Sequence, residues 1–116
     1  MPVYHESVTK LAVSKVALEV ILPPRDLGTM PQRTMTFECA GGSGKLGLAD
    51  AKVQLGPTAN GPWLDEDVSG SGIPTLAAGG AAACRLNKVD RWVRVQAQGA
   101  AGTGQTDLTV YIDALG

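Results

Sequence analysis

The sequence is poor in aromatic residues, in histidine and in net charge. Only five of its 116 residues are aromatic: Tyr4, Phe37, Trp63, Trp92 and Tyr111. Glycine supplies 15 residues and alanine another 15, so much of the 44% hydrophobic fraction consists of side chains that bury little apolar area. This composition argues against a large, self-sufficient core and predicts one small domain that gains stability from partners.

The charge balance excludes several classes of partner. Ten basic and eleven acidic residues give a net charge of −1, without the basic excess typical of nucleic-acid-binding domains. No apolar run reaches the ~18–20 residues that span a bilayer. The first ten residues contain an acid and no apolar stretch of the kind that a secretory signal needs. We therefore expect neither nucleic acid nor membrane as a partner.

Few residues are available for catalysis or metal binding. His5 is the single histidine, and Cys39 and Cys84 lie far from it and from one another in the sequence. A zinc site needs three or four ligands, so we expect no metal, no cofactor and no catalytic residues. Without an export signal, we expect both cysteines to be reduced.

Two other motifs invite a functional interpretation. The stretch Ala40–Lys45 resembles a phosphate-binding loop, but that motif needs glycine at position 39 and Ser or Thr at 46, where the chain has Cys39 and Leu46. We interpret it as a flexible loop between strands. The acidic run 65–67 is interpreted as a solvated loop tip, with calcium or a basic protein as alternative ligands.

Alternating polar and apolar residues predict strands in most of the chain. They cover residues 16–21, 34–39, 51–55, 73–76, 81–86, 92–98 and 106–112, and no ten-residue amphipathic helix is expected after residue 24. Before Pro23 a helix is the alternative to the strand at 16–21, because Leu11, Lys15, Leu18 and Leu22 also fall at helical spacing; β-branched residues favour the strand. Pro23-Pro24 should end the first of these strands, and the residues before Val16 suit an extended arm. The strands at 92–98 and 106–112 are expected to form an antiparallel hairpin.

Turn signals separate these strands at intervals of ~8–15 residues, which is typical of an all-β sandwich. We predict a β-sandwich or jelly-roll-like domain of seven or eight short antiparallel strands. It spans residues 25–116, and residues 1–24 form an N-terminal arm or strand segment.

One local basic concentration stands out. Arg85, Lys88, Arg91 and Arg94 lie within ten residues and surround Trp92. They form either an ordinary solvated edge or a docking patch for an acidic surface, since arginine and tryptophan are favoured at interfaces. Together with Trp63, these residues are the candidate partner-binding site. Stacking of a sugar on Trp63 or Trp92 is the alternative.

Residues 34–116 resemble the small β-sandwich virion proteins of tailed bacteriophages, notably capsid decoration (cement) proteins. The resemblance rests on the strand 51–55, the Asn60-Gly61 turn followed by Trp63, the basic–aromatic strand 91–95 and the closing strand 108–112.

The resemblance implies a non-enzymatic protein that is made in the bacterial cytoplasm and binds the major capsid protein on the outer surface of the virion. It also implies a homo-oligomer, with a trimer favoured, whose N-terminal arm reaches across subunits. A tail, neck or baseplate component and a carbohydrate-binding module are the alternatives.

Overall fold

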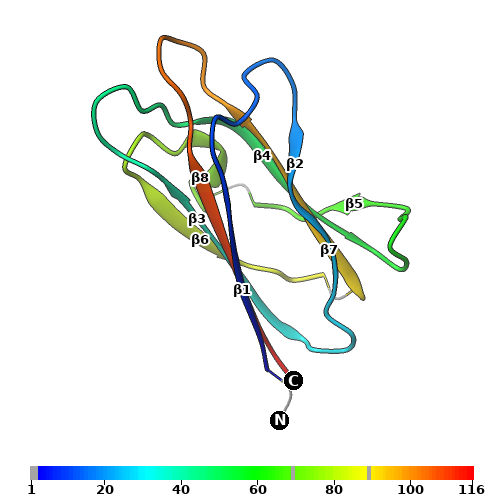
Figure 1. Cartoon of the computed structure of the whole chain (residues 1–116). Helices are drawn as coiled ribbons and strands as arrows, with labels where there is room; N and C mark the ends of the chain where they lie inside the picture. The colour runs from blue at the N-terminus through cyan, green and yellow to red at the C-terminus, as the bar shows by residue number, and fades with distance from the viewer. Residues whose placement is uncertain (1–2, 69, 89) are drawn as a thin grey trace.

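The computed structural model describes residues 3–68, 70–88 and 90–116. In this part of the chain, eight strands form two four-stranded antiparallel sheets that face one another (Figure 1). Sheet A has the order β1 (Val3–Lys10), β8 (Leu108–Leu115), β3 (Gln32–Cys39) and β6 (Ala81–Arg85). Sheet B has the order β2 (Glu19–Asp26), β7 (Trp92–Gly99), β4 (Leu48–Gly56) and β5 (Leu64–Asp65). The predicted all-β sandwich is confirmed.

Among the described strands, consecutive strands lie in opposite sheets except β4 and β5, which pair with each other in sheet B. The sandwich has two distinct ends. The loops 11–18, 40–47 and 100–107 lie at one end, and both chain termini lie at the other (Figure 1).

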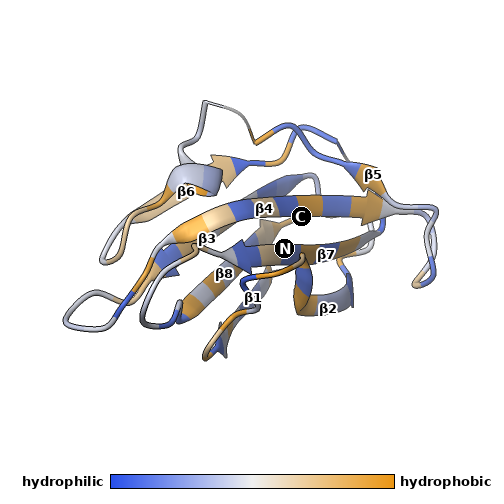
Figure 2. Cartoon of the chain, turned by 90° about the horizontal axis from the view of Figure 1, so that it is seen from above, coloured by the Kyte–Doolittle hydropathy of each residue, from blue (hydrophilic) through white to orange (hydrophobic). Residues whose placement is uncertain are grey.

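The core lies between the sheets, where every second residue of the central strands is buried. Phe37 is its one aromatic side chain, and the rest is aliphatic or sulfur-containing. The fully buried strand residues include Met35, Phe37, Val53, Leu55, Val93, Val95, Leu108, Val110 and Ile112. The period of two in the sequence therefore identified the inward faces correctly. Figure 2 shows the same alternation of hydropathy along the strands.

The prediction that the last two long strands, β7 and β8, form a hairpin is wrong. β7 pairs with β2 and β4 in sheet B, whereas β8 pairs with β1 and β3 in sheet A. Residues 100–107 carry the chain from one sheet to the other. Because each strand has one apolar face, placing them in opposite sheets lets both faces bury against each other.

Two further expectations are corrected. Pro23 and Pro24 do not end the strand: β2 begins at Glu19 and runs to Asp26, with register shifts on either side of Leu22. An irregular strand at the sheet edge tolerates the missing N–H groups. The strand expected at residues 73–76 is a 3-10 turn over Ile73–Thr75, because Gly72 adopts a left-handed φ of 86° and a proline follows in the first turn.

The N-terminal segment is built into the sandwich. β1 pairs with β8 over its whole length, from the partners Val3 and Leu115 to the partners Lys10 and Leu108. Residues 3–10 therefore form a strand of this fold and do not project as an arm. The division at residue 24 stays a prediction. Among the described residues, no helix is long and apolar enough to cross a membrane.

Both cysteines are free. Cys84 pairs with Met35 across β3 and β6, and Cys39 lies four residues further along β3, about 13 Å away at the usual rise per residue. A disulfide requires Cα atoms within about 7 Å, so this register keeps the two thiols apart. Burial, together with the charge of Glu66, raises the pKa of Cys84 to about 11. The thiol is thus protonated and unreactive at neutral pH.

A buried arginine organises the end of the sandwich that carries the termini. The Arg33 side chain donates hydrogen bonds to the backbone carbonyls of Met30 (2.7 Å), Gly28 (3.2 Å) and Asp90. The residue is only 1% exposed, and its burial lowers the pKa of the guanidinium. These bonds tie the β2–β3 loop to the loop before β7.

We expect Arg33→Ala to lower the free energy of unfolding by at least about 2 kcal/mol, because it removes a buried side chain together with its hydrogen bonds to three backbone carbonyls. Arg33→Lys should lose less, since an ammonium group still donates but lacks the planar fork. Urea unfolding measures both. Arg85→Ala, at an exposed position, is the control and should change stability by less than about 0.5 kcal/mol. If Arg33→Ala were as stable as the wild type, Arg33 would not be the residue that stabilises this end of the sandwich.

A buried carboxylate organises the opposite end. Asp107 forms an ion pair with Lys45 and accepts hydrogen bonds from the backbone N–H of Ala12 (2.9 Å) and the amide of Gln105 (2.8 Å). These contacts, led by the bond from Lys45, hold the pKa of Asp107 below its usual value. The carboxylate thereby joins the loops 11–18, 40–47 and 100–107.

A carboxyl group with a lowered pKa in the folded state contributes stability above its unfolded pKa of about 3.9 and loses it as the pH falls through the folded value. We therefore expect Asp107→Asn to have a lower melting temperature than the wild type above about pH 5, and this difference should shrink below about pH 4. Thermal unfolding of both proteins at a series of pH values across this range measures the difference in melting temperature. A difference that is constant with pH would show that the charge of Asp107 is not involved.

Candidate functional site

The structure does not gather the six predicted partner-binding residues into one patch. Arg94, Trp92 and Trp63 lie on the outer face of sheet B. Of the other three residues, Arg85 and Lys88 lie on the side that carries β6, and Arg91 lies beside Asp26 at the end of β2. The candidate site therefore narrows to the first group, which we call the sheet B cluster.

The sheet B cluster is built on alternate residues of β7. Val93 and Val95 are fully buried, so Trp92 and Arg94 point to the outer face. The Arg94 guanidinium lies 4.4 Å from the centroid of the Trp63 ring, and its Nε donates to Oε1 of Gln54 at 2.8 Å. A ring and an amide thus hold the cation in a defined orientation.

The turn before Trp63 explains why this ring lies over the sheet. Gly56 is the register partner of Trp92, and a Cβ atom at Gly56 would lie 3.3 Å from Cε3 of Trp63 and 2.9 Å from the Pro62 carbonyl oxygen. Gly61, with a φ of 91°, reverses the chain toward the sheet. The missing side chain of Gly56 therefore leaves the space that Trp63 needs.

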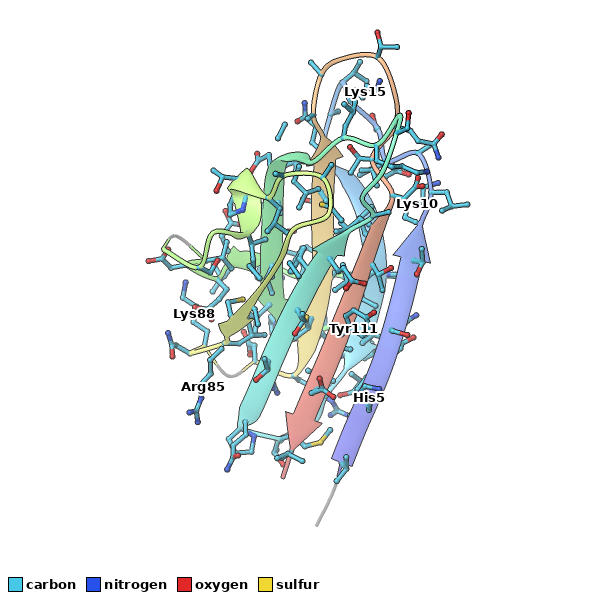
Figure 3. All side chains as sticks on the ribbon, turned by 90° about the vertical axis from the view of Figure 1, so that its left-hand side faces the viewer. His5, Lys10, Lys15, Arg85, Lys88 and Tyr111 are labelled. Carbon is cyan, nitrogen blue, oxygen red and sulfur yellow. The ribbon has the colours of Figure 1, made fainter. Side chains whose placement is uncertain are left out.

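Two of the other predicted cations, Arg91 and Lys88, have internal partners. Arg91 forms a two-pronged contact with Asp26, at 2.9 Å from Nε and 2.8 Å from Nη2. The Lys88 ammonium donates to the backbone carbonyl of Asp65. Figure 3 shows Arg85 and Lys88 on the side of the molecule that carries β6, and Arg85 ends that strand. A chain segment with four cations thus presents them in different directions.

The interpretation of residues 65–67 as a solvated tip is wrong for Glu66. Its side chain is buried, at 5% exposure, and Oε2 accepts the backbone N–H groups of Asn87 (3.1 Å) and Lys88 (2.8 Å). This carboxylate fastens the loop before β7 to the end of β5. Asp65 contacts Gln54 and Lys52 on sheet B. The acidic run therefore has a structural role.

The remaining candidate residues are also dispersed. His5 pairs with Asp113 at 2.5 Å on the outer face of sheet A, and Cys39 is buried in the core. Lys45 of the glycine-rich loop pairs with Asp107. The described residues contain no group of three His, Cys, Asp or Glu side chains placed to hold a metal ion. An open depression of about 350 Å³ is lined by the β2–β3 loop, including Met30, and by Arg91.

Sequence reasoning missed Gln54 and Gly56, which complete the sheet B cluster. A signal for Gln54 was present, because it alternates with the inward residues Val53 and Leu55 and therefore faces outward. It also missed two exposed apolar residues of the loop 11–18, Leu11 and Val16, because that segment was interpreted as part of an arm.

No family model and no curated protein matches this chain. Among solved structures, one similar chain belongs to the disulfide-linked pili of Bacillus endospore appendages, with 11% identity, a TM-score of 0.45, and coverage of 97% of this chain and 88% of that one. Another belongs to the capsid asymmetric unit of the cyanophage Pam1, with 12% identity, a TM-score of 0.44, and coverage of 97% and 84%. PirA has 14% identity, a TM-score of 0.44, and coverage of 95% and 92%. At such low identity and structural overlap, these similarities carry no argument about function.

The contact between Arg94 and Trp63 should be measurable as a coupling energy. In a double-mutant cycle of Arg94→Ala and Trp63→Ala, we expect a coupling of about 0.5–1 kcal/mol in the free energy of unfolding. Urea unfolding of the two single variants and the double variant measures it. A cycle of Arg94→Ala with Gln98→Ala, further along β7, is the control and should show no coupling. Additive losses at Arg94 and Trp63 would contradict the contact.

Proposed function

We propose that this protein is a non-enzymatic structural component of a bacteriophage virion. In the proposal it is a capsid decoration protein that binds the major capsid protein on the outer surface of the assembled shell. The observation that carries the proposal is the sheet B cluster, in which Trp63, Arg94 and Trp92 share one outer face. The sequence resemblance of residues 34–116 to small virion sandwiches supports the identity of the partner.

The sheet B cluster has the chemistry of a protein-binding hot spot. Tryptophan and arginine dominate such spots, because they combine a large contact area with directed hydrogen bonds. The ring of Trp63 and the amide of Gln54 orient Arg94 before any partner arrives, which lowers the entropy lost on binding. Arg94 also covers one face of the Trp63 ring, so that face is not available as a sugar platform.

The proposed mechanism is mass action. A protein that binds only the assembled shell shifts the equilibrium toward that shell, and no chemical step is needed. Because a shell repeats the same site many times, modest affinity at each site suffices when the bound protein is itself an oligomer. We therefore include a homotrimer in the proposal. Sedimentation equilibrium of the protein alone tests this part.

Co-sedimentation with undecorated shells tests the proposed function. The shells are assembled from the major capsid protein encoded in the same genome as this chain. We expect the wild type to pellet with them, and Trp63→Ala with Arg94→Ala to bind at least tenfold more weakly, because the anchor residues are lost. Gln96→Ala, elsewhere on the outer face of sheet B, is the matched control and should bind as the wild type does.

Two results would contradict the proposal. Failure of the wild type to bind shells would exclude a decoration role. Labelled protein that is found only on the tail, neck or baseplate of purified particles would assign it to that part of the virion.

A further inference from the structure

Three of the four edge strands described in the two sheets carry features that keep another strand from pairing with them. β2 contains Pro23 and Pro24 and has register shifts. β5 is only two residues long. β1 carries Glu6 on the same face as Val8, which packs against the core, and Arg25 forms an ion pair with this carboxylate. Prolines, irregular register, short length and inward-facing charge all discourage pairing between sheet edges.

The fourth edge strand, β6, lacks these features. It lies outside β3 at the edge of sheet A (Figure 1). The sequence Ala81-Ala-Ala-Cys84 contains neither proline nor a charged side chain, and its register with β3 is continuous from Ala81 to Arg85. The outward-facing residues Ala81, Ala83 and Arg85 are exposed. The edge of β6 is therefore the one most open to an added strand.

The free hydrogen-bonding groups of this edge follow from the pairing with β3. The N–H of Cys39 donates to the Gly80 carbonyl at 2.9 Å, and the N–H of Leu86 donates to the Arg33 carbonyl at 2.9 Å. Both bonds fit the register of the two strands, and an antiparallel ladder uses every second residue. The N–H and C=O groups that point away from β3 therefore belong to Ala81, Ala83 and Arg85. Within the described ranges, no hydrogen bond reaches these groups.

These groups are complementary to a second copy of the same strand. When two β6 strands pair antiparallel about a twofold axis at Ala83, this residue faces its own copy and Ala81 faces Arg85 of the other copy. Each free N–H then meets a free C=O. The guanidinium lies opposite a methyl group, and the small alanine side chains let the strands reach the ordinary spacing of about 4.8 Å.

Other twofold registers of β6 are less favourable. An axis at Cys84 leaves the groups of Ala81 beyond the paired strands. An axis at Arg85 places two guanidinium groups opposite each other, and like charges in that position are destabilising. The register centred on Ala83 is the one that pairs every free group of the strand without opposing like charges.

We propose that β6 pairs with β6 of a second copy of this chain, in an antiparallel contact centred on Ala83. The contact joins two four-stranded copies of sheet A into one continuous sheet. It is isologous, because the same strand of each copy forms both halves. The inference goes beyond the proposed function, since it requires no shell. In the proposed homotrimer, the contact joins subunits of neighbouring trimers.

The size of the contact sets its strength. Five residues from each strand bury far less than the roughly 1,200–2,000 Å² of a standard interface. We therefore expect association that is weak in dilute solution and increases with concentration. On a surface that holds many copies side by side, the same contact is favoured by the high local concentration.

Cysteine cross-linking tests the register directly. In the proposed contact, the Cα atoms of the two Ala83 residues lie about 5.5 Å apart, within reach of a disulfide. Those of the two Ala81 residues lie about 13 Å apart along the strands. Oxidation with copper phenanthroline should therefore convert Ala83→Cys to a covalent dimer at least tenfold faster than Ala81→Cys. The latter is the matched control, because both positions are exposed on one strand.

Sedimentation equilibrium over a range of concentrations measures the association itself. We expect the average mass of the wild type to rise with concentration. Ala83→Lys should weaken this association at least tenfold, because two ammonium groups would face each other at the axis. Its melting temperature in dilute solution should remain that of the wild type, since the position is exposed. Ser7→Lys, at an exposed position of the edge strand β1, is the matched control and should associate as the wild type does.

The outcomes separate this inference from the proposed function. Equal cross-linking rates of Ala83→Cys and Ala81→Cys would overturn the inference, and so would an association that Ala83→Lys leaves unchanged. Shell binding that Ala83→Lys loses, without a cross-linked dimer of the free protein, would assign the edge to a strand of the shell protein and overturn its assignment to a second copy. Because both measurements use the free protein, a failure of shell binding leaves their results valid.

Discussion

The burial of one apolar face of each sheet against the other is the interaction on which the structure depends. With Phe37 as the one aromatic residue among the fully buried side chains, the sheets must approach closely to exclude water. Glycines at the border of this core allow loops to pack closely against their neighbours. A Cβ atom at Gly47 would lie 2.0 Å from the Leu76 carbonyl oxygen, and one at Gly99 would lie 2.8 Å from Oγ1 of Thr106. Small residues are therefore part of how this core closes and not a sign of a missing core.

A sandwich of this kind leaves its loops at two ends, and each end has its own buried ionic group. At the end with the termini, Arg33 donates hydrogen bonds to the carbonyls of Gly28, Met30 and Asp90. At the other end, Asp107 contacts residues of three loops. Both groups form hydrogen bonds with backbone atoms of these loops. The loops are consequently positioned by the fold.

One outer surface is the sheet B cluster, which combines an oriented arginine with two indole rings. Charged groups elsewhere are held by structural partners, since Asp26 pairs with Arg91 and Asp107 pairs with Lys45. In the proposed role as a shell-binding protein, such polar groups stabilise the fold and the residues of the sheet B cluster are available for the partner.

The sequence by itself determined the strands at the centre of the fold and which of their residues are buried, because an alternation with a period of two is a local property of each strand. It could not determine that β7 and β8 belong to opposite sheets, since the pattern names the buried face and not the neighbouring strand. Only the tertiary structure decided that Glu66 is buried, that Pro23 and Pro24 lie within an edge strand, and that Arg94 stands apart from Arg85, Lys88 and Arg91. Each of these depends on residues distant in the chain that come into contact when the sheets close.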